Sequence, residues 1–280
     1  MIQMNDIEFK YARQSKLFSQ LSWRLNQGGI YGLLGKNGAG KTTLLKLIAG
    51  LIFPKKGKCH VMDFTPSKRN PFYLQELFLI PEEFELPKLR INQYEQLYAP
   101  FYPIFDQEDF YQLINEFDLH HGEKIHSLSF GQRKKVLIAF GIATNTRLLI
   151  MDEPTNGLDI PSKSQFRKLM ASRINENRTY IISTHQVKDI EKLVDAIVVL
   201  EEGKIIFQQS LFEITEALTF NFEQIEPKDT IHHENELGGF VTLRKNETDS
   251  ETDINLELLF NAITLNPAEV NKCFPGGQNG

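Results

Sequence analysis

The chain has 280 residues, of which 41% are hydrophobic and 24% charged, and its formal net charge at pH 7 is −5. This composition is that of a globular protein with a sizeable core, and the acidic balance argues against broad binding to nucleic acid. Two cysteines without CxxC spacing give no sign of a disulfide framework or a cysteine zinc site. No signal-peptide pattern and no apolar run near the ~20 residues of a membrane-spanning helix are found, so we expect a cytoplasmic protein.

Short apolar runs alternate with helical patterns along the first three quarters of the chain. Strands are predicted at 7–10, 18–25, 29–34, 77–80, 148–151, 179–182 and 196–200, and helices near 44–51 and 162–173. The aromatic-rich stretch 89–144 is helical in pattern, which predicts a helical subdomain over about 84–146 with most of its aromatic rings in a core and some along a groove. Strands that alternate with helices predict an α/β fold with a largely parallel sheet.

The pattern changes after about residue 211. Strands are predicted at 219–222 and 239–243, followed by a short helix at 254–263 with Asp253 as its N-cap. The last residues have the composition of a loose tail. We therefore predict a main domain over 1–212, a small α+β C-terminal accessory unit over 213–266 and a flexible tail over 267–280.

A phosphate-binding loop is predicted at residues 35–42, which fit G-x-x-x-x-G-K-[ST] between a predicted strand and a predicted helix. Glycines let the backbone amides turn toward phosphates, Lys41 can reach the β- and γ-phosphates, and the Thr42 hydroxyl can coordinate Mg²⁺. The helix that follows adds its partial positive end. The predicted phosphate contacts are Gly35, Lys36, Asn37, Gly38, Ala39, Gly40, Lys41, Thr42 and Thr43. A flexible glycine loop without a ligand is the alternative.

The apolar strand at 148–151 ends in two carboxylates, Asp152 and Glu153. Such a strand end would place Asp152 near Mg²⁺ and leave Glu153 facing the γ-phosphate, where it can orient and deprotonate water. Buried strands often end in acidic residues, so this pattern alone is weak evidence. The phosphate loop earlier in the chain is what favours a catalytic role for the two carboxylates.

Residues 128–132, Leu-Ser-Phe-Gly-Gln, precede a basic triplet and an apolar helical stretch, and taken alone they predict a helix capped by Ser129. The pentapeptide resembles the LSGGQ signature of ABC ATPases, with Phe130 in place of the middle glycine. The phosphate loop, this signature, the Asp-Glu pair, residues 157–159 and His185 stand in that family's order within 1–212. The resemblance implies a P-loop NTPase of the ABC cassette type, with a mostly parallel sheet, an antiparallel β part and a helical subdomain.

The resemblance also implies roles for residues that contact a second cassette. Ser129 and Gly131, with Gln132 beside them, would belong to the segment that contacts the γ-phosphate bound by the partner. Asp159 would lie in the loop that touches the partner's site.

Three further residues take roles from their place in the family's order. His185 would be the switch histidine that touches the γ-phosphate, although a lone histidine is more often structural. Tyr11 would stack on adenine, unless it only packs at a strand edge. Glu82 stands where the family usually has a glutamine, so a carboxylate would take the place of that Mg²⁺ ligand and link to the membrane partner.

These implications together describe an ATP- and Mg²⁺-dependent ATPase that powers transport, in the export direction, through a separate integral membrane permease. The chain would lie peripherally on the inner face of the cell membrane and pair with a second cassette, identical or related, with no nucleic acid as partner. One rival is a non-transport ABC protein acting on ribosomes or DNA, which a single cassette without a long heptad run disfavours. A scaffold that binds ATP as a structural ligand is the other rival, and Glu153 and His185 argue against it.

Overall fold

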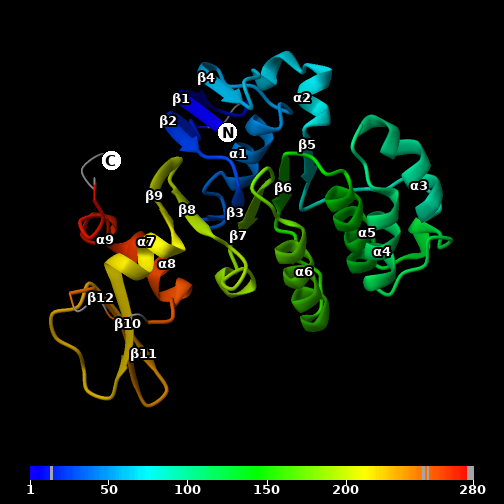
Figure 1. The fold of residues 1–280 in the computed structure, drawn as a ribbon. Helices are drawn as coiled ribbons and strands as arrows, with labels where there is room; N and C mark the ends of the chain where they lie inside the picture. The colour runs from blue at the N-terminus through cyan, green and yellow to red at the C-terminus, as the bar shows by residue number, and fades with distance from the viewer. Residues whose placement is uncertain (13–14, 248–249, 251, 276–280) are drawn as a thin grey trace.

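The computed structural model describes residues 1–12, 15–247, 250 and 252–275. At its centre is a six-stranded sheet in the order β5-β6-β7-β3-β8-β9 (Figure 1). Its strands are β3 (Gly29–Leu34), β5 (Leu77–Ile80), β6 (Leu148–Asp152), β7 (Thr179–Thr184), β8 (Ala196–Glu201) and β9 (Lys204–Ser210). The first five are parallel and β9 pairs antiparallel with β8, so the predicted α/β class is confirmed.

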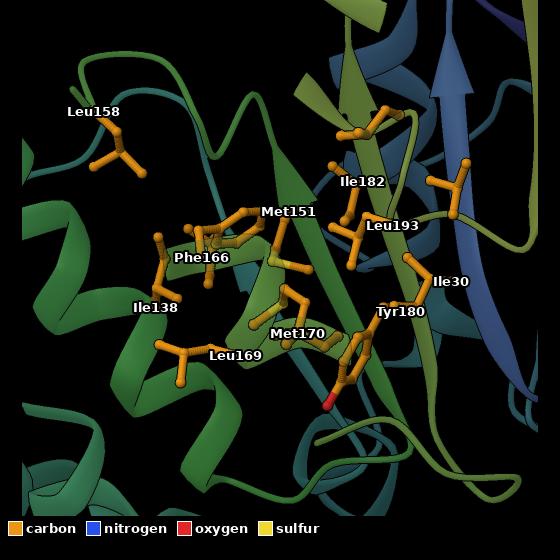
Figure 2. Close-up of a cluster of buried hydrophobic side chains, with 14 of the residues drawn as sticks. Ile30, Ile138, Met151, Leu158, Phe166, Leu169, Met170, Tyr180, Ile182 and Leu193 are labelled. Carbon is orange, nitrogen blue, oxygen red and sulfur yellow. The ribbon is translucent and has the colours of Figure 1, made fainter. Parts of the chain in front are cut away.

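Both faces of this sheet are covered, which explains why its strands are continuous apolar runs rather than alternating ones. Leu148 and Ile150 of β6 pack in the cluster that contains the apolar residues of α1 (Lys41–Ile48). Leu149 and Met151 point to the other face, toward α5 (Phe130–Ala143) and α6 (Ile160–Arg173). Figure 2 shows that second face, where Met151 lies among side chains such as Phe166 and Met170. The sheet therefore lies between α5 and α6 on one face and a cluster of α1 and the strands of an antiparallel sheet on the other.

A second, antiparallel sheet lies beside the phosphate-loop helix, in the order β2-β1-β4 (Figure 1). It consists of β1 (Ile2–Phe9), β2 (Phe18–Leu25) and β4 (Lys56–Val61), and a short 3₁₀ turn η1 (Pro66–Lys68) and α2 (Pro71–Gln75) follow it. The predicted strand at 7–10 is too short, because polar residues alternate with buried Ile2 and Met4 from the start of the chain. The edge strand β4 escaped prediction since its first residues are polar and exposed.

The helical region consists of α3 (Ile91–Tyr98), η2 (Ala99–Phe101), α4 (Gln107–Glu116), η3 (Ile125–Ser127) and α5. Phe110, Phe117 and Phe140 are buried there, as expected for an aromatic core. Phe101, in contrast, is 62% exposed. Within the described residues, no helix combines the length and apolar character needed to cross a bilayer.

The C-terminal part consists of α7 (Leu211–Ala217), the sheet β10-β12-β11, α8 (Leu256–Leu265) and α9 (Pro267–Asn271). The strands are β10 (Leu218–Glu223), β11 (His232–Glu236) and β12 (Gly239–Lys245), of which the polar β11 was not predicted. The N-cap of α8 is Asn255 rather than Asp253, because the Asn255 side chain accepts the Leu258 amide.

The C-terminal part is packed onto the segment after β7 rather than held on a separate core. Buried residues of α8 share one cluster with Val187 of η4 (Val187–Asp189) and with Ile190. Glu257 also forms a 2.7 Å ion pair with Lys188. The division between a cassette over 1–212 and an accessory unit over 213–266 stays a prediction, since the apolar core runs across it.

The flexible tail predicted over 267–280 is wrong for its first part, and its last five residues lie outside the described ones. Residues 267–271 form α9, where Val270 is fully buried. Phe274 is 5% exposed and packs edge-on against Phe207 of β9, with 5.3 Å between ring centroids. Asn271 donates a 3.0 Å hydrogen bond to the Ile206 carbonyl. These apolar anchors order a segment whose proline and glycine content suggested disorder.

Phe274→Ala should lower the free energy of unfolding by about 3 kcal/mol, because it removes a buried ring from the α9–β9 contact. Phe212→Ala is the matched control, since Phe212 is 73% exposed, and it should change stability by less than about 0.5 kcal/mol. Urea unfolding followed by the fluorescence of Trp23 checks this. Trp23 donates a 2.7 Å hydrogen bond to Gln208 of β9, the strand that Phe274 contacts. Equal stability of the two variants would contradict the anchoring role of Phe274.

Candidate nucleotide-binding and hydrolysis site

The predicted phosphate loop lies between the end of β3 and the start of α1, at the carboxyl edge of the central sheet. Gly40 takes the N-cap position of α1 with φ 108° and without a side-chain cap. An added Cβ there would lie 2.9 Å from the Phe18 ring, so space and backbone conformation both require glycine. The first amides of α1 have no side-chain acceptor and stay available for an anion.

A cavity of about 390 Å³ opens in front of this loop, which is a volume within the range of small-ligand sites. Its lining includes the predicted residues Tyr11, Lys36, Asn37, Gly38, Gly40, Lys41, Thr42, Thr43, Glu82 and Glu153. Gly35 and Ala39 are buried behind the loop and do not line the cavity. Ser15, Lys16 and Leu17 line it as well, and sequence reasoning missed them because no motif covers the segment after Tyr11.

Tyr11 lies at the cavity wall with its ring fixed on two sides. Its hydroxyl shares a 3.0 Å hydrogen bond with the Thr43 hydroxyl. Its ring meets Phe9 edge-on at 5.0 Å between centroids, and the side chain is 37% exposed. A half-exposed aromatic ring in this position leaves a face free, and the predicted stacking of Tyr11 on adenine stays a prediction.

Lys41 is buried under the loop, where its ammonium donates to the Gly35 carbonyl at 2.7 Å. Burial lowers the pKa of Lys41, and the nearby carboxylates, Glu153 first, oppose that effect. The Lys41 ammonium is 3.8 Å from Glu153 Oε1. The phosphate-binding cation and the predicted general base are thus direct neighbours.

Glu153 follows β6 in a left-handed backbone conformation, with φ 46°, which costs a residue other than glycine roughly 1–2 kcal/mol. Its amide donates to the carbonyl and hydroxyl of Ser183 on β7, at 3.1 and 3.2 Å. The carboxylate is almost fully buried, and Oε2 has no hydrogen-bond partner among the described residues. An unpartnered buried oxygen beside the phosphate loop fits a group that accepts a proton from water or faces a cation.

His185 contacts Glu153 rather than the cavity itself. Its Nδ1 lies 2.8 Å from Glu153 Oε1, and the residue is not part of the cavity lining. It follows β7 directly, which places it one strand away from the Asp-Glu pair. In this arrangement the histidine orients the carboxylate, and the predicted contact with a γ-phosphate stays a prediction.

The three predicted Mg²⁺ ligands occupy different depths. Thr42 and Glu82 line the cavity, whereas Asp152 is 3% exposed at the end of β6 and accepts the Ser183 hydroxyl. Glu82 also accepts a 3.0 Å hydrogen bond from the Asn156 amide. No described residues form a cluster of three or more side chains for a metal. This sparse oxygen set fits Mg²⁺ that is held mainly by phosphates and water.

The predicted signature residues lie away from this cavity. Ser129 caps α5, accepting the Gln132 amide at 3.2 Å while the Gln132 side chain accepts the Ser129 amide at 2.9 Å. An added Cβ at Gly131 would come within 2.7 Å of the Gly157 carbonyl. The signature therefore packs directly on the loop after the Asp-Glu pair.

Asp159 is exposed beside that contact and caps α6. Its carboxylate accepts the Ser162 amide at 2.9 Å, and hydrogen bonds from Ser162 lower the pKa of Asp159. None of Ser129, Gly131, Gln132 or Asp159 lines the cavity of its own chain. The predicted site residues thus fall into two groups on the same molecule.

Comparison with known proteins agrees with this geometry. A family model described as ABC transporter matches residues 18–156. The chain is 30% identical over 204 residues to the ABC transporter ATP-binding protein YtrB of Bacillus subtilis (strain 168), covering 72% of this chain and 70% of that protein. It is 32% identical over 213 residues to the bacitracin transport ATP-binding protein BcrA of Bacillus licheniformis, covering 74% of this chain and 68% of that protein.

A solved structure shows the same fold at lower sequence identity. It is the dimeric, post-hydrolysis state of the ATP-binding cassette MJ0796 bound to ADP and Pi, which is 19% identical. The match has a TM-score of 0.65 and covers 75% of this chain and 99% of that one. The motifs, the fold and the relatives agree, and the chain therefore belongs to the ATP-binding proteins of ABC transporters, the subunits that bind and hydrolyse ATP to power transport.

Proposed function

We propose that two copies of this chain close on two ATP molecules and drive export through a separate membrane permease. The observation that carries this proposal is the separation of the predicted site residues into two groups. Lys41, Thr42 and Glu153 line the cavity, whereas Ser129 and Gly131 stand at the start of α5 and do not line it. One chain has a complete set of both groups, so two copies related by a two-fold axis would form two complete sites.

Within one such site, each side chain would have a distinct task. The Lys41 ammonium would neutralise phosphate charge, and the amides at the start of α1 would hold the same phosphate oxygens. The Glu153 carboxylate would take a proton from the attacking water, while His185, 2.8 Å from Oε1, would keep it oriented. Ser129 from the second copy would add donors to the far side of the phosphate.

Thr42, Glu82 and Asp152 are the residues that would hold Mg²⁺. When bound, the metal supplies charge neutralisation on the phosphate oxygens. Glu82 differs from the neutral glutamine that the family usually has, so it brings an additional negative charge to the cavity edge. Its hydrogen bond from Asn156 fixes one carboxylate oxygen and partly offsets that charge.

A permease partner and a position on the inner face of the membrane are supported by membership of the ATP-binding proteins of ABC transporters. Three exposed apolar side chains are candidates for contact with the permease. Phe72 of α2 is 71% exposed, Phe101 of η2 is 62% exposed and Ile104 is 57% exposed. Export as the direction is supported by likeness to exporter ATPases.

Glu153→Gln should lower kcat for ATP hydrolysis by about 10²–10⁴-fold, because the amide cannot accept the proton of the attacking water. Binding of a fluorescent ATP analogue should stay within a factor of about three, since the phosphate loop is untouched. Phosphate release and nucleotide titration measure the two quantities. Glu176→Gln, an exposed loop substitution, is the matched control with native activity. A Glu153→Gln protein that hydrolyses ATP at the native rate would contradict the role of Glu153 as the general base.

Mixing two inactive variants tests the shared site. Lys41→Ala removes the cation from a chain's own cavity, and Ser129→Arg blocks the signature that this chain offers to its partner. A mixed dimer keeps one intact site, formed by Lys41 of the second variant and Ser129 of the first. The ATPase rate of the mixture should rise well above the sum of the two alone. No gain on mixing would mean that each chain uses its own Ser129.

A further inference from the structure

Lys134 is a fully buried lysine that no sequence motif marks. It lies on α5, and its exposed fraction is 0%. Its ammonium donates to the backbone carbonyls of Glu153 and Asn156, each at 3.0 Å. Burial lowers the pKa of Lys134, and the charges of Glu82, Glu153 and Asp152 oppose that effect. A buried cation is costly unless its donors are matched, and these two carbonyls are its hydrogen-bond acceptors.

The first of these carbonyls belongs to Glu153, the proposed general base. Glu153 has its amide bonded to Ser183 and its carbonyl bonded to Lys134, so both sides of its left-handed backbone are held. A strained conformation of this kind persists only when the surrounding structure fixes it. The Glu153 carbonyl also accepts the backbone amide of Asn156 at 3.2 Å, so Lys134 and the turn after Glu153 hold this carbonyl together.

The second carbonyl connects Lys134 to two other segments of the site. The Asn156 side chain donates to Glu82 at 3.0 Å and accepts from the Gln186 amide at 3.3 Å. Gln186 directly follows His185. Lys134 therefore connects α5, the helix after the signature, to the loop that contains Asn156. That loop is hydrogen-bonded to Glu82 at the cavity edge and to Gln186 beside His185.

Phe130, the residue that departs from the family's signature, covers this ammonium. Its ring centroid lies 5.2 Å from the Lys134 Nζ, within the range of a cation–π contact. The same ring stacks on Phe84, with 5.4 Å between centroids and 29° between planes. The aromatic pair therefore packs on one side of the buried ammonium.

We propose that Lys134 is a positioning residue for ATP hydrolysis, which holds the Glu153 backbone so that its carboxylate faces the cavity, with Phe130 as its cover. This inference rests on the proposed role of Glu153 as the general base. Lys134 does not line the cavity, so it acts through Glu153 and not on the nucleotide.

Lys134→Met keeps the length and volume of the side chain and removes its donors. It should lower kcat by about 10²-fold, since a misplaced general base loses its alignment with water, while KM for ATP changes by less than about threefold because the cavity is intact. Lys134→Gln keeps an N–H donor on a shorter side chain and should recover part of the loss. Steady-state kinetics with matched circular dichroism spectra provide these values.

A double-mutant cycle with Glu153→Ala separates positioning from a general structural role. If Lys134 acts through the carboxylate, Lys134→Met should have no further effect on the residual rate of Glu153→Ala. A full additional loss in that background, or native kcat in the single Lys134→Met variant, overturns the proposal. If Lys134→Met does not fold, the same cycle is run with Lys134→Gln and the same outcomes decide. Native activity of Glu153→Ala alone would instead refute the proposed role of Glu153.

Discussion

The hydrogen-bonded register of three parallel strands, β6, β7 and β3, determines where Glu153, His185 and the phosphate loop lie. Asp152 pairs with Ser183 across β6 and β7, and the strands end at one edge, as open α/β sheets with ligands at that edge do. The next residues along the chain are Glu153, His185 and the phosphate loop. This register brings Lys41 within 3.8 Å and His185 within 2.8 Å of one carboxylate oxygen. A shift of one residue would turn these side chains to the opposite face.

In the proposed dimer, the same edge would link one cassette to its neighbour. The loop after Glu153 contacts the signature helix through Gly157 and Gly131, and it is bonded to that helix by Lys134. The signature residues do not line their own chain's cavity and, in the proposed dimer, would reach the partner's nucleotide. A change at the bound phosphate can therefore be passed through packed backbone to the surface that the other copy contacts. The C-terminal helix α8 packs against the segment after His185, where Val187 and Ile190 share its apolar cluster.

The sequence predicted the parts of this protein that short-range patterns specify. Apolar runs located the central strands, and the phosphate loop and Asp-Glu pair carry chemistry at fixed spacing. Edge strands such as β4 and β11 were missed because polar residues predominate in them, and β4 has buried residues only at its end. Lys134 could not be recognised, since a lysine in a basic triplet is expected at the surface, and only the fold shows that its partners are two carbonyls. The order of residues 267–271 depends on a contact with β9, which is distant in sequence.

The central claim, that two copies of this chain share their nucleotides, is tested most directly by the solution mass of the Glu153→Gln protein. Light scattering after size exclusion would compare it in Mg-ATP and in Mg-ADP. The account predicts a dimer with ATP, because each bound γ-phosphate is held by Ser129 of the other copy, and a monomer with ADP, which lacks that phosphate. A monomer in both nucleotides would contradict the shared site between identical chains.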